Sequence, residues 1–356
     1  MASSSIAQLL GTQLPLIQAP MAGAQGSAMA VAVSDAGALG SLPCAMLTPD
    51  AMRAELTAIQ AATGGKPYNV NFFCHHVPVP SPQREADWRQ ALAPYYAEFG
   101  IDPAGIAAGA GRNPFSAEAA AVLEDFKPAV VSFHFGLPAD DLLARVRAWG
   151  AKVLCSATTV DEARWLAARG VDAIIAQGLE AGGHRGHFLS PDLTRQMGTF
   201  ALLPQLVKAV DVPVIAAGGI ADADGVRAAM ALGAAGVQVG TAYLLCPEAT
   251  ISAPHRAALS GKIGAAHLHT ALTNLFTGRP ARGIMNRLMR ELGPLGDVAP
   301  EFPLATAAIA PLRAKAESQG SGDFSPLWSG QNASGCKPIP AAELTRELAA
   351  GFSARS

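Results

Sequence analysis

Short apolar runs alternate with Ala-rich amphipathic stretches through the first two thirds of the chain. Eight of these apolar runs have the length and the Gly, Pro or Asp boundaries that are typical of buried strands. The predicted strands are 14–19, 38–42, 68–73, 129–135, 152–156, 173–177, 212–217 and 236–240. Helical periodicity predicts helices between them at 27–36, 50–62, 139–149, 160–169 and 222–232.

Eight strands that alternate with helices over about 240 residues favour the α/β class, as a (β/α)8 TIM barrel. A doubly wound open sheet is the alternative architecture. The number of units and the positions of the motifs described below favour the barrel.

Two regions interrupt the repeat. A segment at about 74–116 follows the third strand as an insertion, and its part 83–99 has a helical pattern. Residues 246–356 are too many for one closing helix and have helical patterns at 284–292, 304–317 and 341–350. We therefore expect a barrel domain over 1–245 and a helical extension over 246–356 that covers the barrel mouth.

Composition narrows the class of protein. The chain has 356 residues, of which 50% are hydrophobic and 15% charged, and its net charge is −2. There is no long basic run, so nucleic-acid binding and attraction to a membrane surface have little support. The apolar stretches stop well short of the roughly 20 residues that a membrane span needs, and residues 1–5 lack the pattern of a signal peptide.

The five cysteines are odd in number, far apart and without CxxC spacing. They predict reduced thiols and a cytoplasmic protein without a metal site. The exposed helices of a barrel allow a monomer or a homodimer.

The most informative segment, 177–187, directly follows the sixth predicted strand. TIM barrels build their active sites from the loops at the carboxyl ends of the strands. Gly182 and Gly183 would let backbone N–H groups approach a ligand closely, and His184 adds a group that can transfer protons. His184 could instead only hydrogen-bond a loop carbonyl, and the nearby His187 could compete for its role. Arg185 could bind an anion or be solvated.

Two glycine motifs follow the seventh and eighth strands: Gly218-Gly219, and Gly240 with Thr241. Loops at these positions commonly bind phosphate through backbone N–H groups and a helix N-terminus. Tight turns without a ligand are the alternative for either motif alone. Their occurrence on adjacent strands favours a phosphate site.

Other strand ends carry amides and a histidine. Asn71 and Gln177 could match the donor and acceptor edge of a planar heterocycle or could cap turns. Met21 and Ala22 would give such a ring an apolar surface. His134 lies in an aromatic strand, where it could be a core residue or contact a substrate.

Together these motifs resemble the nitronate monooxygenase family, formerly called 2-nitropropane dioxygenases. The resemblance covers about residues 15–245 and a short element at 327–331. It is carried by Asn71 together with Gln-Ala-Pro-Met-Ala-Gly at 18–23, Glu-Ala-Gly-Gly-His at 180–184 and Ala-Gly-Gly-Ile at 217–220. The runs at 132–136 and 329–331 look more like the bacterial class I enzymes than like the related reductases.

The resemblance implies a TIM barrel that binds FMN non-covalently. His184 matches the family's active-site histidine, and His134 matches a histidine of its substrate pocket, which His187 would join. The expected flavin contacts are Met21, Ala22, Asn71, Gln177, Gly182, Gly183, Gly218, Gly219, Gln238, Val239, Gly240 and Thr241. Gly330 and Gln331 would close over the flavin from the extension.

The implied reaction uses a small-molecule nitronate and O2. The nitronate gives one electron to FMN, and the semiquinone and substrate radical react with O2 to give a carbonyl compound and nitrite. The class I resemblance suggests propionate 3-nitronate as the substrate. His184 could hold the nitro oxygens when protonated, or take the α-proton of a nitroalkane when neutral.

Two alternatives remain. The first is an FMN-dependent NAD(P)H reductase of the same fold, either an enoyl-acyl-carrier-protein reductase or a quinone reductase, because the Gly-Gly-His loop is shared with such enzymes. The second is a phospholigand-binding barrel without flavin.

Overall fold

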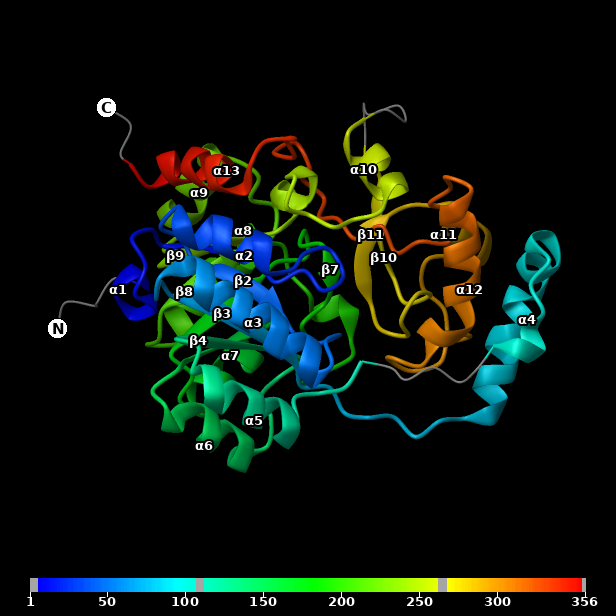
Figure 1. The fold of residues 1–356 in the computed structure, drawn as a ribbon, viewed down its shortest axis with the longest axis horizontal. Coiled ribbons are helices and arrows are strands. Elements are labelled where there is room, and N and C mark those ends of the chain that lie inside the picture. Colours follow the sequence, from blue (N-terminus) through cyan, green and yellow to red (C-terminus); the bar gives the residue numbers. More distant parts are fainter. Residues whose placement is uncertain (1–5, 107–111, 262–267, 354–356) are drawn as a thin grey trace.

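The computed structural model describes residues 6–106, 112–261 and 268–353. Within them, parallel strands form the barrel in the order β1-β9-β8-β6-β5-β4-β3-β2 (Figure 1). Leu39 at the start of the β2 segment pairs back with Ile17 of β1 and closes the ring. The strands are β1 (Leu16–Gln18), β2 (Gly40–Pro43), β3 (Tyr68–Phe73), β4 (Val130–His134), β5 (Lys152–Ala157), β6 (Ala173–Gln177), β8 (Val214–Ala217) and β9 (Gly236–Val239). The predicted TIM barrel is confirmed.

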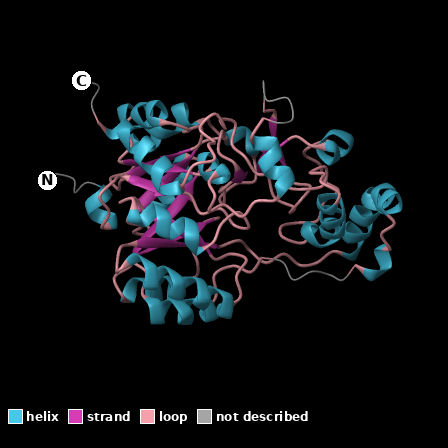
Figure 2. Ribbon diagram, turned by 45° about the horizontal axis from the view of Figure 1, so that its top comes forward, coloured by secondary structure: helices cyan, strands magenta, loops and turns pink. Residues whose placement is uncertain are grey.

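Burial on both faces explains why these strands read as continuous apolar runs. Ile17, Leu154, Ile175 and Ile215 belong to a buried cluster that fills the barrel together with Ile6 and Leu10 of the short helix α1 (Ile6–Leu10). The opposite strand faces pack on the surrounding helices (Figure 2). The polar residues at the strand ends are therefore the exceptions in an apolar wall.

The ring of helices is completed from the far end of the chain. It contains α2 (Ser27–Asp35), α3 (Pro49–Thr63), α5 (Ala117–Phe126), α6 (Asp140–Ala148), α7 (Val160–Ala167), α8 (Thr199–Ala209), α9 (Ala223–Ala231) and α13 (Ala341–Ala349). α13 packs on α2 and α9, with Leu344 and Leu348 in the buried cluster between the helices and the strands. The last part of the region expected as a covering extension thus belongs to the barrel wall.

The segment between β9 and α13 forms a second lobe with the insertion after β3. It contains α10 (Ala253–Leu259), β10 (Thr270–Thr273), β11 (Ala281–Ile284), α11 (Arg287–Leu292) and α12 (Ala305–Ser318). α4 (Pro82–Phe99), the helix expected at 83–99, packs against α12 (Figure 1). The indole N–H of Trp88 donates to Ala305 O at 3.1 Å, and the hydroxyl of Tyr96 donates to Ala308 O at 2.6 Å.

Strands β10 and β11 were not predicted. The helix expected at 284–292 begins only at Arg287, because 281–284 is a strand that pairs with β10. The domain boundary at 245 stays a prediction. Short 3-10 turns complete the fold at η1 (Pro103–Gly105), η2 (Leu193–Arg195), η3 (Thr241–Leu245) and η4 (Ala350–Phe352).

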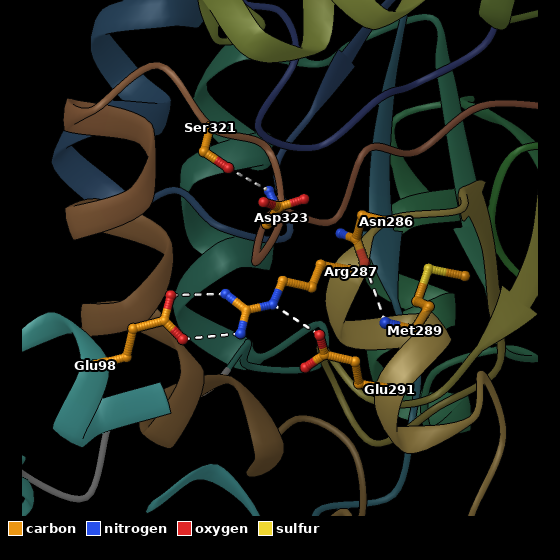
Figure 3. A network of polar contacts seen from close by, with 7 residues as sticks. All are labelled: Glu98, Asn286, Arg287, Met289, Glu291, Ser321 and Asp323. Carbon is orange, nitrogen blue, oxygen red and sulfur yellow. Dashed lines mark hydrogen bonds and ion pairs between the residues drawn. The ribbon is translucent and has the colours of Figure 1, made fainter. Parts of the chain in front are cut away.

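A polar network ties α4 to α11 on the surface of this lobe. The guanidinium of Arg287 donates two hydrogen bonds to Glu98 of α4, at 2.7 and 2.8 Å, and one to Glu291 at 2.8 Å (Figure 3). The bidentate geometry makes this the kind of ion pair that adds orientation as well as energy. The insertion is thereby attached to residues about two hundred positions later in the chain.

None of the helices in the described ranges has both the length and the apolar character needed to cross a lipid bilayer.

Gly40 provides a test of the packing between strand and helix. A Cβ at this position of β2 would overlap backbone atoms of Ala30 in α2, so Gly40→Ala forces two main chains apart. We expect its free energy of unfolding to fall by about 1–3 kcal/mol or more, measured by chemical denaturation. The control is Gly105→Ala, where a Cβ has no heavy atom within 4 Å. Equal stability of the two variants would contradict the packing described here.

Candidate functional site

A cavity of about 410 Å³ opens at the carboxyl ends of the barrel strands, within the range of small-molecule and cofactor sites. Most of the residues singled out from the sequence lie on its wall. They are Met21, Ala22, Asn71, His134, Gln177, Gly182, Gly183, His184, Gly218, Gly219, Gln238, Gly240, Thr241 and Gly330. The barrel therefore brings together motifs that are up to three hundred residues apart in the chain.

Three candidates are not on the wall. Val239 packs in the core between strands and helices, because it alternates with the cavity-lining Gln238 along β9. His187 is buried beyond the loop, where its carbonyl accepts a hydrogen bond from Arg279. Gln331 has an exposed side chain, although its backbone N–H donates to Glu180 O at 2.9 Å. No side-chain contact of these three with a ligand in the cavity follows from the fold.

The glycine–histidine segment is a strand rather than a free loop. Gly183 and His184 form β7 (Gly183–His184), which pairs antiparallel with β11 through Arg282 and Ala281. The backbone N–H of Arg185 continues this pairing with a hydrogen bond to Pro280 O at 2.9 Å. His184 is thus positioned by residues of the second lobe.

Arg185, for which anion binding or solvation was expected, does neither. Its side chain is fully buried, and it donates to Gly178 O at 2.7 Å and to Gln177 O at 2.9 Å. Two further hydrogen bonds go to Oε1 of Gln196. The guanidinium braces the loop between β6 and β7 from inside, and its donors are used by carbonyl groups.

Gln177 also shapes this loop. Its amide nitrogen donates to His184 O at 2.9 Å, and its Oε1 accepts from Gly186 N at 2.7 Å. The buried Glu162 holds the next turn by accepting from Phe188 N at 2.7 Å. One amide and one carboxylate therefore fix the backbone from His184 to Phe188.

The protonation of His134 follows from its partners. Its Nε2 lies 3.1 Å from the carbonyl oxygen of His184, which can only accept, so Nε2 carries the proton. Its Nδ1 then accepts from the hydroxyl of Ser156 at 3.0 Å. Burial lowers the pKa of His134 to about 3, in agreement with a neutral ring.

His184 lies in an aromatic pocket. The ring centres of Phe302, Trp328, Phe73 and Phe135 lie 5.2, 5.5, 6.0 and 6.0 Å from its own. Burial, followed by the positive charge of Arg112, lowers the pKa of His184 well below its ordinary value. The imidazole is therefore neutral at physiological pH. A neutral ring favours taking the α-proton of a nitroalkane over holding the nitro oxygens.

Unused hydrogen-bonding groups line the other part of the wall. Gly218 and Gly219 have φ of 117° and 74°, so their turn is strained for any residue with a side chain. Thr241 Oγ1 accepts from Gly330 N at 2.9 Å and keeps its own proton to donate. Oε1 of Gln238 is buried without a hydrogen-bond partner among the described residues, which is uncommon unless a ligand supplies the donor.

Several residues of the cavity wall were not predicted from the sequence. Arg112 comes from the insertion, and His255, Arg313 and Glu317 come from the second lobe. Trp328 stood in the short element at 327–331, which was the available indication that the second lobe reaches the site. For the others no local pattern distinguishes a cavity residue from a surface one.

The comparisons with known proteins agree with this geometry. The family model for nitronate monooxygenase matches residues 3–351. A nitronate monooxygenase from Pseudomonas aeruginosa is 42% identical over 346 residues, which cover 96% of this chain and 97% of that protein. The chain belongs to the nitronate monooxygenase family. A probable nitronate monooxygenase from Staphylococcus saprophyticus is 36% identical, over 93% of this chain and 92% of its own length.

Two solved structures match the fold over nearly the whole chain. The nitroalkane oxidase from Streptomyces ansochromogenes matches with a TM-score of 0.87 at 38% identity, and 98% of each chain is covered. FabK from Thermotoga maritima matches with a TM-score of 0.70 at 25% identity, over 99% of this chain and 96% of that one. As a member of the nitronate monooxygenase family, this protein is an oxidoreductase, and the resemblance stated from the motifs is confirmed.

The buried histidines predict an acid-sensitive fold. Burial lowers the pKa of His134 and His187 to about 3 and that of His75 to about 4, whereas histidine in an unfolded chain titrates near pH 6.5. Between pH 6.5 and 4 the unfolded state therefore binds more protons, and stability falls as the pH falls. Each such histidine contributes a slope of up to about 1.4 kcal/mol per pH unit.

This slope can be measured by urea unfolding at pH 7, 6 and 5. His187→Leu removes one buried titrating group without leaving a polar atom behind, so its stability should depend less steeply on pH than that of the unmodified protein. The same slope for both proteins would show that His187 is not held neutral.

Proposed function

We propose that this protein binds FMN non-covalently and oxidises alkyl nitronates with O2 to a carbonyl compound and nitrite. Propionate 3-nitronate is the substrate that we favour. The observation that carries the proposal is one cavity in which a neutral His184, surrounded by aromatic rings, shares the wall with the glycine pairs and Thr241.

The residues of the wall fit the proposed cofactor. A flavin is a planar heterocycle with donors and acceptors on its edge, so its N–H group could satisfy the orphaned Oε1 of Gln238. Its phosphate could accept from the backbone of Gly219 and Gly240 and from the hydroxyl of Thr241. Met21 and Ala22 would give the ring an apolar contact. When bound, FMN would supply the redox chemistry with nitronate and O2.

His184 would act on the substrate through its Nδ1. Its Nε2 lies 2.9 Å from Oγ1 of Thr277, whose hydroxyl donates to Arg279 O at 3.4 Å. With the threonine proton so placed, Thr277 accepts from Nε2–H, and Nδ1 is the basic atom. This nitrogen could take the α-proton of a neutral nitroalkane, whereas a nitronate has already lost that proton and needs His184 only for its position.

An FMN-dependent NAD(P)H reductase on the same barrel is the competing function. The relative at 42% identity is named a nitronate monooxygenase, which favours the oxygenase, and the one at 38% is named a nitroalkane oxidase rather than a reductase. The five cysteines are free, which supports a cytoplasmic location. The fold is compatible with both a monomer and a homodimer.

The two functions differ in their electron donor. Purified protein should be yellow, and anaerobic propionate 3-nitronate should change its visible spectrum, while NADH and NADPH should leave it nearly unchanged. Rapid bleaching by NADH or NADPH would identify a reductase. Protein that stays colourless after incubation with FMN would identify a barrel without flavin.

His184→Asn tests the assigned base. The variant should keep FMN but lose most nitronate turnover, because the ring that positions the substrate is gone. Turnover of a neutral nitroalkane should fall further, by about 10²-fold or more, since proton abstraction is also lost. His134→Asn is the comparison variant. The Nε2–H of His134 already donates to His184 O, so His134 is not the assigned base. Unchanged activity of His184→Asn would remove this residue from the mechanism.

A further inference from the structure

Arg112 is a half-buried cation on the wall of the cavity, and no carboxylate of the described residues pairs with it. It lies near the end of the insertion, before α5. Among the described residues its guanidinium donates one long hydrogen bond, from Nη1 to Oγ1 of Thr306 at 3.3 Å, and takes part in no ion pair with a carboxylate. The charged group that acts on it most strongly is another cation, Arg313.

Such an arrangement is costly. Burial lowers the pKa of Arg112 to about 10, so the group is still charged at neutral pH. A buried charge is normally compensated by a partner or by several hydrogen bonds, and a guanidinium has five N–H donors. No other acceptor among the described residues takes the remaining donors of Arg112, so these donors could bind an anion that enters the cavity.

Neighbouring arginines show the contrast. The donors of Arg185 are used by loop carbonyls, and Arg282 donates to Leu179 O at 2.9 Å and to Thr270. Arg279 donates to His187 O and stacks on the ring of Phe135 at 4.1 Å; its buried Nε has no partner among the described residues, but Arg279 does not line the cavity. Arg313 lines the cavity but pairs with Glu317 at 3.0 Å.

Arg112 belongs to the same part of the cavity as His184. The ring centre of Phe302 lies 5.2 Å from that of His184 and 5.9 Å from the guanidinium carbon of Arg112. The ring of Phe302 is thus close to both the imidazole of His184 and the guanidinium of Arg112. An anion held by Arg112 would therefore lie on the side of the cavity where Phe302 and His184 meet.

We propose that Arg112 binds the nitronate group of the substrate, with its N–H groups donating to the two oxygens of that group. The inference rests on the proposed function and adds the residue that recognises the substrate charge. A nitronate has two oxygens in one plane, as a carboxylate has, and a guanidinium can bind such a pair bidentately. With a nitroalkane, the α-C–H bond breaks and its proton moves to Nδ1 of His184. The C–H electron pair forms the C=N bond, and the N=O π pair moves onto the oxygens beside Arg112.

Arg112→Met and Arg112→Lys should distinguish binding of the nitronate group from binding of the substrate carboxylate or of FMN. In FMN-loaded Arg112→Met, kcat/KM should fall about 10- to 100-fold for both ethyl nitronate and propionate 3-nitronate, mainly through KM. Arg112→Lys should recover part of the loss for both substrates, because the charge is kept and the fork is lost. Arg89→Met is the control: Arg89 holds the same segment through Pro103 O and Ile106 O but is outside the cavity wall.

Several results would overturn the proposal. A loss confined to propionate 3-nitronate would show that Arg112 binds the carboxylate. Weaker FMN binding with an unchanged KM would assign Arg112 to the cofactor. An equal rise in KM in Arg89→Met would show that only the position of the segment matters.

A binding measurement is independent of turnover. Nitrate, a planar oxyanion, serves as the probe in calorimetric titration of the FMN-loaded protein. We expect binding to the unmodified protein and at least about tenfold weaker binding to Arg112→Met. If the protein binds nitrate through Arg112 but turns over no nitronate, the proposed function fails while the anion site stands. Equal nitrate binding by both proteins would refute the anion site itself.

Discussion

The pairing of β7 with β11 is the contact on which the site depends. Gly183 and His184 would otherwise belong to a surface loop, whose backbone has many conformations available. Their hydrogen bonds to residues 281 and 282 hold this backbone against the second lobe. The barrel therefore supplies the floor of the cavity, and residues about a hundred positions later determine where the histidine lies.

Buried charges hold the same segment from the other side. Arg185 and Glu162 compensate carbonyl and N–H groups that a turning backbone leaves unpaired. Their own desolvation is offset by these hydrogen bonds, so they stabilise one loop geometry without adding free charge to the cavity. The cavity keeps an aromatic and cationic character around neutral histidines.

Local patterns predicted the barrel well, and contacts between distant segments account for what was missed. The strand at 173–177 and the glycine pairs could be read from the chain, because apolar runs and turn residues are local properties. β7 has two residues and exists only through its partner β11. The place of α13 depends on packing against α2 and α9. Nothing in the neighbourhood of Arg112 in the sequence distinguishes it from a solvated arginine.

The electrostatics of the site favour a division of roles between the histidine and the arginine. Two positive groups in an apolar pocket repel each other and both lose solvation, so the group with the lower intrinsic pKa gives up its proton. His184 is that group, and its neutral state leaves a nitrogen able to accept a proton. The permanent charge then belongs to Arg112, whose guanidinium cannot serve as a base at neutral pH. A cavity that must hold an anion and also abstract a proton requires both groups, because a single protonated histidine cannot perform the second task.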